Sequence, residues 1–476
     1  MTSARPNVVV VMSDTLRTAY LGCYGNDDVH TPNIDEFADM SVKFNRAYPE
    51  SLPTVPVRRA MFTGRRAFPF HDYKPVPWDI VTLPGWEPMD PKKDTIAENL
   101  AAAGYHTGLC ADTLPMFAPG FNFQRGFWQW EYIRGMQQDR WRSVHTVTQK
   151  DLDGYQHYIS PEGRNIPEQM YSHVPYHIAN KRGQLHEQDT TTAQTFQWAM
   201  DFLEDNRGAE PFYLYVDSFA PHEPWEAPPM YHEMYSDGSY DGDTIIHVRY
   251  QTREEQGIDG AATRDILAHY CGLTTLVDTW FGMMLDKLDR LGLMDDTMVV
   301  FMSDHGTNFG FDNPFDIIGK PSFSLWPGVM HLPLLVKFPD GAGAGTECDE
   351  LVYNIDVTGT IADLAGVQTR DPIDAQSLVP LAGGGGEWER REWATSRYND
   401  DLCYIDDEIW IRTNTDRELG EAFDVQADPL CQDDISDELD DAVFQRAWKR
   451  ILKDAGDEVP VYDDEHVTDA IGQTYD

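Results

Sequence analysis

Lysine is scarce in this chain. Only 11 of its 37 basic residues are lysines, against 80 acidic residues in a total of 476. The formal net charge of −43 excludes nucleic acid and anionic membrane surfaces as main partners, because like charges repel. The acidic residues are spread along the whole chain. This favours a protein of a high-salt cytoplasm, where counterions screen the repulsion, over a local store of cations.

Paired cysteines and long apolar runs are also missing. The six cysteines form no C-x-x-C pair, which predicts reduced thiols in an intracellular protein. No run of 18 apolar residues occurs, so we expect no membrane-spanning helix, and residues 1–6 do not read as a secretion signal. The length and an apolar share of 41% predict a buried core large enough for one large and one small domain.

Two short apolar runs predict buried strands, and each is followed by residues of the types that bind metals. Residues 8–12 lead to Asp14, and residues 298–302 lead to Asp304 and His305. Such runs are typical of parallel strands covered on both faces, and open α/β sheets bind ligands at the carboxyl ends of these strands. Carboxylates and imidazole together indicate a metal site, although Asp14 could instead cap a helix.

A hydroxyl, a proline and a cation are closely spaced between residues 54 and 65. Thr54-Val55-Pro56-Val57-Arg58 is followed, after four residues, by Thr63-Gly64-Arg65. A helix that begins near Pro56 would direct free N–H groups toward the hydroxyl, and one turn would bring Arg58 close to the Thr54 oxygen. These groups suit a tetrahedral sulfate or phosphate. The alternative is a proline-containing loop without a catalytic role.

This stretch resembles the signature of the sulfatases in the alkaline phosphatase superfamily, which reads Cys or Ser, x, Pro, x, Arg, four residues, Thr-Gly. Three other elements resemble the family in the same order along residues 6–430: Asp14, Pro221-His222-Glu223-Pro224, and Asp304-His305 with Lys320. The resemblance implies an α/β fold. Its central sheet would be doubly wound, with helices on both faces, and a small C-terminal α+β subdomain would follow.

The resemblance also implies the residues of the site. One divalent ion, Ca²⁺, Mn²⁺ or Zn²⁺, would be held by Asp14, Thr54, Asp304 and His305. Catalysis would be carried by Thr54, Arg58, His222 and Lys320. Arg58 and Lys320 would stabilise the anionic group of a small ester substrate, and His222 would protonate or orient the leaving oxygen. The oligomeric state stays open.

The chain departs from the family at the nucleophile, because Thr54 stands where sulfatases carry the Cys or Ser that becomes formylglycine. A formylglycine hydrate expels sulfate through its second hydroxyl, which threonine lacks. Water can cleave a phospho-threonine at phosphorus, whereas sulfur in a sulfo-threonine is poorly electrophilic. We therefore favour phosphate or phosphonate esters. The alternatives are a sulfuric ester hydrolase with an altered mechanism and a non-catalytic anion-binding protein.

Two further departures and the domain boundaries follow from the sequence. Thr15 replaces a second aspartate found in many sulfatases, and residues 111–114 lack the lysine and histidine that often follow there. Glycines at 383–386 predict a linker between a catalytic domain at 1–370 and a subdomain at 389–460, with an acidic tail at 461–476. The aromatic stretch 121–180 predicts either a lid or a second aromatic core.

Overall fold

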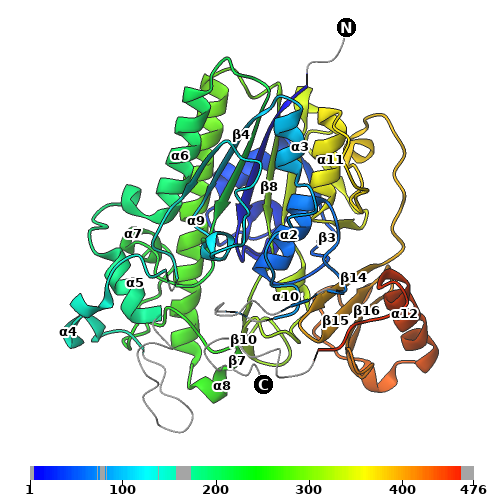
Figure 1. The fold of residues 1–476 in the computed structure, drawn as a ribbon. Coiled ribbons are helices and arrows are strands. Elements are labelled where there is room, and N and C mark those ends of the chain that lie inside the picture. Colours follow the sequence, from blue (N-terminus) through cyan, green and yellow to red (C-terminus); the bar gives the residue numbers. More distant parts are fainter. Residues whose placement is uncertain are drawn as a thin grey trace.

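The computed structural model is built around an eight-stranded sheet (Figure 1), and it describes residues 5–71, 73–74, 81, 83–137, 139–156 and 173–462. The strand order is β12-β2-β11-β8-β1-β6-β4-β5. The strands from β8 to β5 are parallel, and β11 is antiparallel to β8. The bounds are β1 (Asn7–Ser13), β2 (Val42–Phe44), β4 (His106–Ala111), β5 (Gln129–Tyr132), β6 (Phe212–Ser218), β8 (Thr297–Ser303), β11 (Leu334–Lys337) and β12 (Thr346–Cys348).

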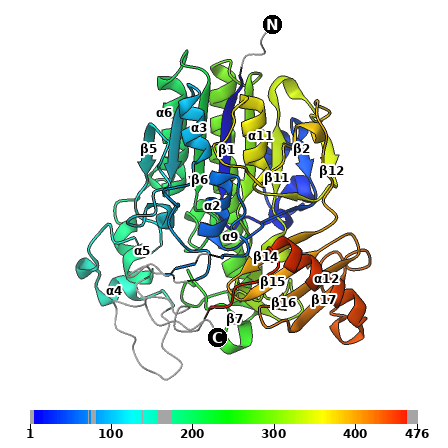
Figure 2. The same cartoon turned by 45° about the vertical axis from the view of Figure 1, so that its right-hand side comes forward.

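Helices cover both faces of this sheet, which confirms the doubly wound prediction (Figures 1 and 2). Successive side chains of β1 enter two different cores: Val8 and Val10 pack in one, Val9 and Val11 in the other. The first core is covered by α2 (Thr54–Thr63), α3 (Ile96–Ala102) and α11 (Asp356–Ala365). The second is covered by α1 (Pro32–Asp39), α6 (Thr191–Asp205) and α9 (Gly260–Arg290).

A four-stranded antiparallel sheet follows near the C-terminus and lies below the main sheet in Figure 2. Its elements are β14 (Ala394–Tyr398), β15 (Asp401–Ile405), β16 (Ile409–Asn414), β17 (Leu419–Asp424) and the covering helix α12 (Asp441–Asp454). It is joined to the main domain by Trp410, whose indole N–H donates to the Leu325 carbonyl at 2.8 Å. β14 is a buried but largely polar segment.

The remaining elements are short and surround the carboxyl edge of the main sheet. They are β3 (Ala47–Tyr48), β7 (Gln251–Thr252), β9 (Asn308–Phe309), β10 (Ile317–Gly319), β13 (Val352–Tyr353), α4 (Gln149–Leu152), α5 (His173–Lys181), α7 (Pro229–His232), α8 (Arg253–Gln256) and α10 (Pro327–Met330). In the aromatic stretch 121–180, Phe121 and Phe123 pack in the main core and β5 forms the sheet edge. Residues 157–172 of that stretch, and the predicted tail beyond 462, lie outside the described residues.

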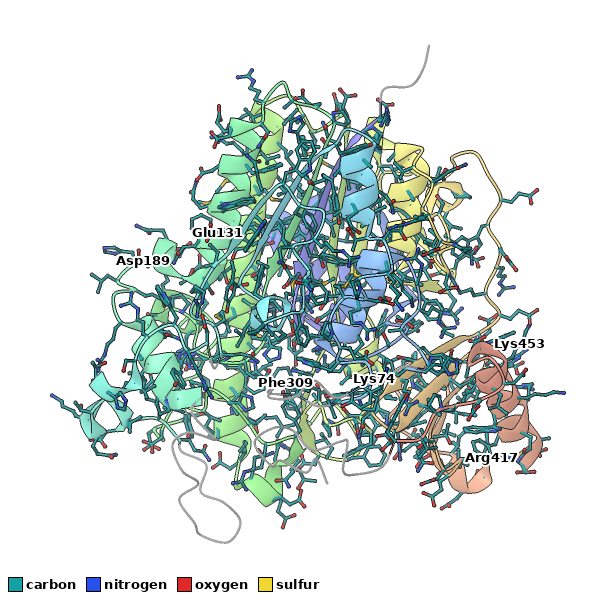
Figure 3. All side chains as sticks on the ribbon, in the orientation of Figure 1. Lys74, Glu131, Asp189, Phe309, Arg417 and Lys453 are labelled. Atoms are coloured by element: carbon teal, nitrogen blue, oxygen red, sulfur yellow. The ribbon has the colours of Figure 1, made fainter. Side chains whose placement is uncertain are left out.

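Charged side chains project around the whole periphery, as Glu131, Asp189 and Lys453 do in Figure 3, whereas Phe309 is buried. All six cysteines are unpaired, as predicted. Within the described part of the chain, no helix has both the length and the apolar character needed to cross a membrane.

Candidate active site

Two adjacent strands bring three predicted metal ligands together. β1 and β8 are parallel and in register, with Ser13 opposite Ser303, so the residues that follow them, Asp14 and Asp304, leave the sheet side by side. His305 Nε2 lies 3.5 Å from Asp304 Oδ2 and 4.0 Å from Asp14 Oδ1. One ligand atom from each of the three residues falls within 4.8 Å of the others, and all three side chains are fully buried.

The local backbone fixes the two carboxylates. Thr15 has φ 63°, an unusual value for a β-branched residue. In that conformation its N–H donates to Asp304 Oδ1 at 3.0 Å, and its hydroxyl donates to Asp14 Oδ1 at 2.8 Å. Gly306 is required by close packing, because a Cβ there would lie 2.1 Å from the Gly328 carbonyl oxygen. Two hydrogen bonds from Thr15 thus orient both acids.

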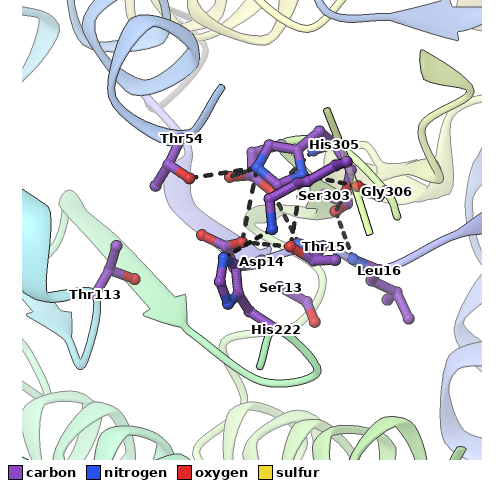
Figure 4. Close-up of polar contacts among 12 residues, drawn as sticks. Ser13, Asp14, Thr15, Leu16, Thr54, Thr113, His222, Ser303, His305 and Gly306 are labelled. Atoms are coloured by element: carbon purple, nitrogen blue, oxygen red, sulfur yellow. Dashed lines mark hydrogen bonds and ion pairs between the residues drawn. The ribbon is translucent and has the colours of Figure 1, made fainter. Parts of the chain in front are cut away.

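Thr54 is the first residue of α2, and its hydroxyl reaches the same cluster (Figure 4). Its Oγ1 lies 3.3 Å from His305 Nε2. His305 Nδ1 donates to the Gly306 carbonyl at 3.0 Å, so Nε2 carries the lone pair and the Thr54 hydroxyl is the donor. Burial lowers the pKa of His305 to about 4, which keeps the imidazole neutral at physiological pH.

Arg58 is locked by protein acceptors on all sides. Its Nε and Nη2 donate to the two oxygens of Asp217, each at 2.8 Å. Nη1 donates to Asp304 Oδ2 at 2.6 Å and to the Thr54 carbonyl at 3.2 Å, and Nη2 also donates to Asp14 Oδ2 at 3.0 Å. All five guanidinium N–H groups are therefore used. Contrary to expectation, Arg58 contacts the Thr54 backbone rather than its hydroxyl and has no donor left for a substrate.

Asp217 was not selected by the sequence analysis. It is fully buried near the end of β6, next to β1, and accepts the Thr113 hydroxyl at 2.5 Å in addition to Arg58. The sequence does hold a signal for it, because residues 212–216 form a third apolar run and Asp217 follows directly. Asp217 makes the third acid around one guanidinium.

His222 and Lys320 form a second group beside the first. Lys320 Nζ lies 2.9 Å from His222 Nε2, and the ring centroids of His222 and His305 are 6.5 Å apart. His222 Nδ1 donates to the Glu223 carbonyl at 2.7 Å, so its Nε2 accepts from the ammonium of Lys320. Both side chains are almost fully buried. The structure thus brings all seven residues implied by the sequence to one edge of the sheet.

Comparison with known proteins agrees with this geometry. The family model "Sulfatase" matches residues 6–367. The chain belongs to the sulfatase family. A second family model, "N-sulphoglucosamine sulphohydrolase, C-terminal", matches residues 324–456.

Individual relatives of this sulfatase-family chain are distant but align over nearly the whole length. The multifunctional alkaline phosphatase superfamily protein PehA of Trinickia caryophylli is 24% identical, over 89% of this chain and 90% of that protein. An arylsulfatase of Clostridium perfringens is also 24% identical, over 89% of each chain. The phosphonate monoester hydrolase of Agrobacterium radiobacter has a similar fold, with a TM-score of 0.70, 20% identity and 95% of both chains covered. As a sulfatase-family protein, the chain is a sulfuric or phosphoric ester hydrolase.

The electrostatics of this sulfatase-family site leave an excess of negative charge. Three buried acids, Asp14, Asp217 and Asp304, face Arg58, and a fourth, Glu223, faces Lys320. Burial and the neighbouring Asp304 raise the pKa of Asp14 well above its usual range. Burial also opposes ionisation of Asp304, but the charge of Arg58 and the N–H of Thr15 outweigh it and lower its pKa. Burial acts to lower the pKa of Arg58, yet the three acids raise it overall, so the guanidinium stays charged.

The site fits the divalent ion that the sulfatase family generally uses. A carboxyl group must lose its proton to bind a metal, and with Asp14 ionised in this way four buried carboxylates against two cations leave two negative charges, which one divalent ion would neutralise. His305 Nε2 lies 3.3 Å from the Thr54 hydroxyl, 3.5 Å from Asp304 Oδ2 and 4.0 Å from Asp14 Oδ1, a donor set of one nitrogen and several oxygens.

Proposed function

We propose that this sulfatase-family protein is a metal-dependent hydrolase of phosphorus esters, phosphate or phosphonate, in which Thr54 is the nucleophile. The observation that carries the proposal is the Thr54 hydroxyl, nearly buried and 3.3 Å from the lone pair of His305 Nε2 within the acidic cluster. Threonine offers a single hydroxyl. That suffices for attack and later cleavage at phosphorus but removes the exit used for sulfate.

The ligands of the ion would be Asp14, Thr54, Asp304 and His305. A divalent ion bound there would act as a Lewis acid that favours the deprotonated Thr54 oxygen and offsets charge on the ester. Imidazole among the ligands favours Mn²⁺ or Zn²⁺ over Ca²⁺, which prefers oxygen alone.

The residues of the chain divide the remaining work. The Thr54 hydroxyl loses its proton to solvent, and its oxygen forms a bond to phosphorus while the bond to the leaving alcohol breaks. Water then attacks phosphorus, which breaks the bond to Thr54, restores its hydroxyl and releases the phosphate or phosphonate product. Arg58 holds Asp14, Asp304 and the first turn of α2 in place, since its donors are all engaged. This role replaces the substrate contact first expected of Arg58. Lys320 remains as the cation for the ester and its leaving oxygen.

His222 Nε2 accepts a hydrogen bond from Lys320 and so fixes the position of the ammonium group. Neutral His222 has its proton on Nδ1, bonded to the Glu223 carbonyl, so Nε2 has none to give. The proton for the leaving oxygen is therefore assigned to Lys320, in place of the direct protonation by His222 first considered.

The test is a substrate panel on Thr54 variants. Purified protein in molar salt with Mn²⁺ or Zn²⁺ would be assayed on aryl phosphate monoesters, diesters, phosphonates and sulfates. Thr54→Ala should reduce turnover of the best phosphorus ester by roughly 10³-fold or more, whereas Thr54→Ser should retain much of it. Metal content of each variant, measured by elemental analysis, controls for loss of the ion.

Aryl sulfates turned over faster than every phosphorus ester by the wild type would contradict the choice of phosphorus. Full activity of Thr54→Ala would contradict the choice of nucleophile. Thr54→Cys, produced together with a formylglycine-generating enzyme, should shift preference toward sulfate esters because the converted residue has a second hydroxyl.

A further inference from the structure

Glu223 is a buried acid that has no role in the proposed reaction so far. It follows His222 in the loop after β6, and its side chain is 0% exposed. A carboxylate placed so deeply needs several donors to compensate for lost hydration. Its surroundings supply them from three separate segments of the chain.

One oxygen of Glu223 faces the two groups assigned to the leaving oxygen. Oε2 lies 3.2 Å from His222 Nδ1 and 3.5 Å from Lys320 Nζ. The Nδ1 proton of His222 is therefore shared between the carbonyl and the carboxylate of the same residue. This contact stabilises the tautomer in which His222 Nε2 accepts from Lys320.

The other oxygen faces the loop at residues 247–250. Oε1 accepts the Tyr250 hydroxyl and lies 3.8 Å from His247 Nε2. Lys320 Nζ in turn lies 5.3 Å from the centroid of the Tyr250 ring. Gly319 leaves room for this ring, since a Cβ there would lie 2.2 Å from Tyr250 Cδ1. Glu223 thus joins the loops that carry His222, Tyr250 and Lys320.

Ionised Glu223 is consistent with its neighbours. Burial acts to raise its pKa, but the N–H of neutral His222, the ammonium of Lys320 and the Tyr250 hydroxyl outweigh burial and hold the pKa well below the usual range. The carboxylate therefore carries a full charge beside the ammonium of Lys320.

We propose that Glu223 is a positioning residue that holds His222 and Lys320 so that the Lys320 ammonium meets the leaving oxygen of the ester. The proposal rests on the leaving-oxygen role of Lys320 described above. As the phosphorus–oxygen bond breaks, its electron pair goes to the leaving oxygen, which takes a proton from Lys320. The neutral amine then regains a proton from solvent water.

The consequence is a dependence on the leaving group. An alcohol of high pKa needs the proton as its bond breaks, whereas a good leaving group such as 4-nitrophenolate departs without it. Loss of correct positioning should therefore slow poor leaving groups selectively, which a general loss of folding would not do.

The experiment compares Glu223→Gln, Glu223→Asp and Lys320→Met with wild type on methyl aryl phosphates whose leaving groups range from 4-nitrophenol to phenol. For Glu223→Gln we expect kcat on the phenyl ester to fall by about 10²–10³-fold, and on the 4-nitrophenyl ester by less than about 10-fold. KM should change little. Glu223→Asp keeps the charge, so its kcat should depend on the leaving-group pKa more steeply than that of wild type and less steeply than that of Glu223→Gln. It replaces the glutamine variant if that one does not fold.

Glu226→Gln is the matched control. Glu226 lies three residues further on and pairs with a histidine, a lysine and a tyrosine of its own: His177 at 2.5 Å, Lys181 at 2.9 Å and Tyr155 at 2.9 Å. It bonds to α5 and Tyr155 instead of to the group formed by His222 and Lys320. Its loss should slow all esters equally or not at all.

The outcomes separate the two proposals. A steep leaving-group dependence in both Lys320→Met and Glu223→Gln supports them both. If the loss of kcat depends steeply on the leaving group in Lys320→Met but is the same for every leaving group in Glu223→Gln, the role of Glu223 alone is overturned. Flat responses in both overturn the assignment of Lys320 as well. If wild type hydrolyses only sulfates, the same aryl series made as sulfates tests Glu223 although the phosphorus proposal has failed.

Discussion

Replacing Asp217 by asparagine tests whether the acids around Arg58 control catalysis. Both side chains are 0% exposed, and the guanidinium makes two parallel contacts of 2.8 Å with the carboxylate. Asparagine keeps one acceptor but turns an N–H₂ group toward another N–H donor. Breaking a buried ion pair typically costs about 3–5 kcal/mol of unfolding free energy. Because Asp14 and Asp304 still face Arg58, we expect about 3 kcal/mol, the lower end.

Asp356→Asn is a matched control far along the chain. Arg391 donates two hydrogen bonds to Asp356, one to each carboxylate oxygen, at 2.6 and 2.7 Å, and the acid is fully buried at the start of α11. Both variants would be unfolded with urea in molar salt, and kcat/KM would be measured on the best ester. Both should lose comparable stability.

Only Asp217→Asn should also lose catalysis. Arg58 would shift by a fraction of an ångström or more, and Asp14, Asp304 and the Thr54 carbonyl would shift with it. Misplacement by about 1 Å can cost 10²-fold in rate, so we expect kcat/KM to fall by about that factor. Equal stability losses with turnover preserved in both variants would refute the reasoning, because Arg58 would then hold its position without Asp217.

Three further outcomes are expected. Burial raises the pKa of Asp112 to about 7, so the native state keeps this proton longer than the unfolded chain, and the group's contribution to stability is lost as pH rises from about 4 to about 7. Asp112→Asn keeps the acceptor for the Phe219 N–H, so across that pH range its free energy of unfolding should rise relative to wild type by at most about 4 kcal/mol. A difference in melting temperature between variant and wild type that is the same at pH 5 and pH 8 would contradict this. The melting temperature should fall when salt is lowered from 1 M to 0.01 M, because screening extends from about 3 Å to about 30 Å around a chain of net charge −43, and unchanged melting would exclude salt adaptation. Removal of divalent ions by a chelator should abolish turnover and lower the melting temperature. Adding the ion back at 100 times its Kd should raise the free energy of unfolding by about 2.7 kcal/mol. Turnover that survives in protein shown by elemental analysis to be metal-free would refute the metal dependence.

The sequence predicted the parts of the site that follow from strand pattern. Apolar runs at residues 8–12 and 298–302 became β1 and β8, and the acids after them meet because neighbouring parallel strands end at one edge. The family resemblance supplied Thr54, His222 and Lys320, which lie in loops or at a helix start where periodicity gives no signal.

What could not be predicted depends on tertiary contacts. How many acceptors surround a guanidinium is settled only when β1, β6, β8 and α2 are packed together, so Arg58 was given a substrate contact that its five occupied donors do not allow. The polar strand β14 was missed because its sequence Ala-Thr-Ser-Arg-Tyr does not alternate, although all five residues are buried. Gly306 is needed for close packing against Gly328, a contact between distant segments that no local pattern predicts.

The registered pairing of β1 with β8 has a consequence for which ions the protein can use. Asp14 and Asp304 each follow directly on their strand, so the separation of their backbones is set by the inter-strand spacing of about 4.8 Å, a constant of β structure. The protein cannot widen that spacing for a larger ion without breaking hydrogen bonds in the middle of its sheet. Any evolutionary change of ion preference in this fold must therefore come from side chains at the edge of the sheet, such as those at positions 15 and 305. The distance between the two strands stays constant.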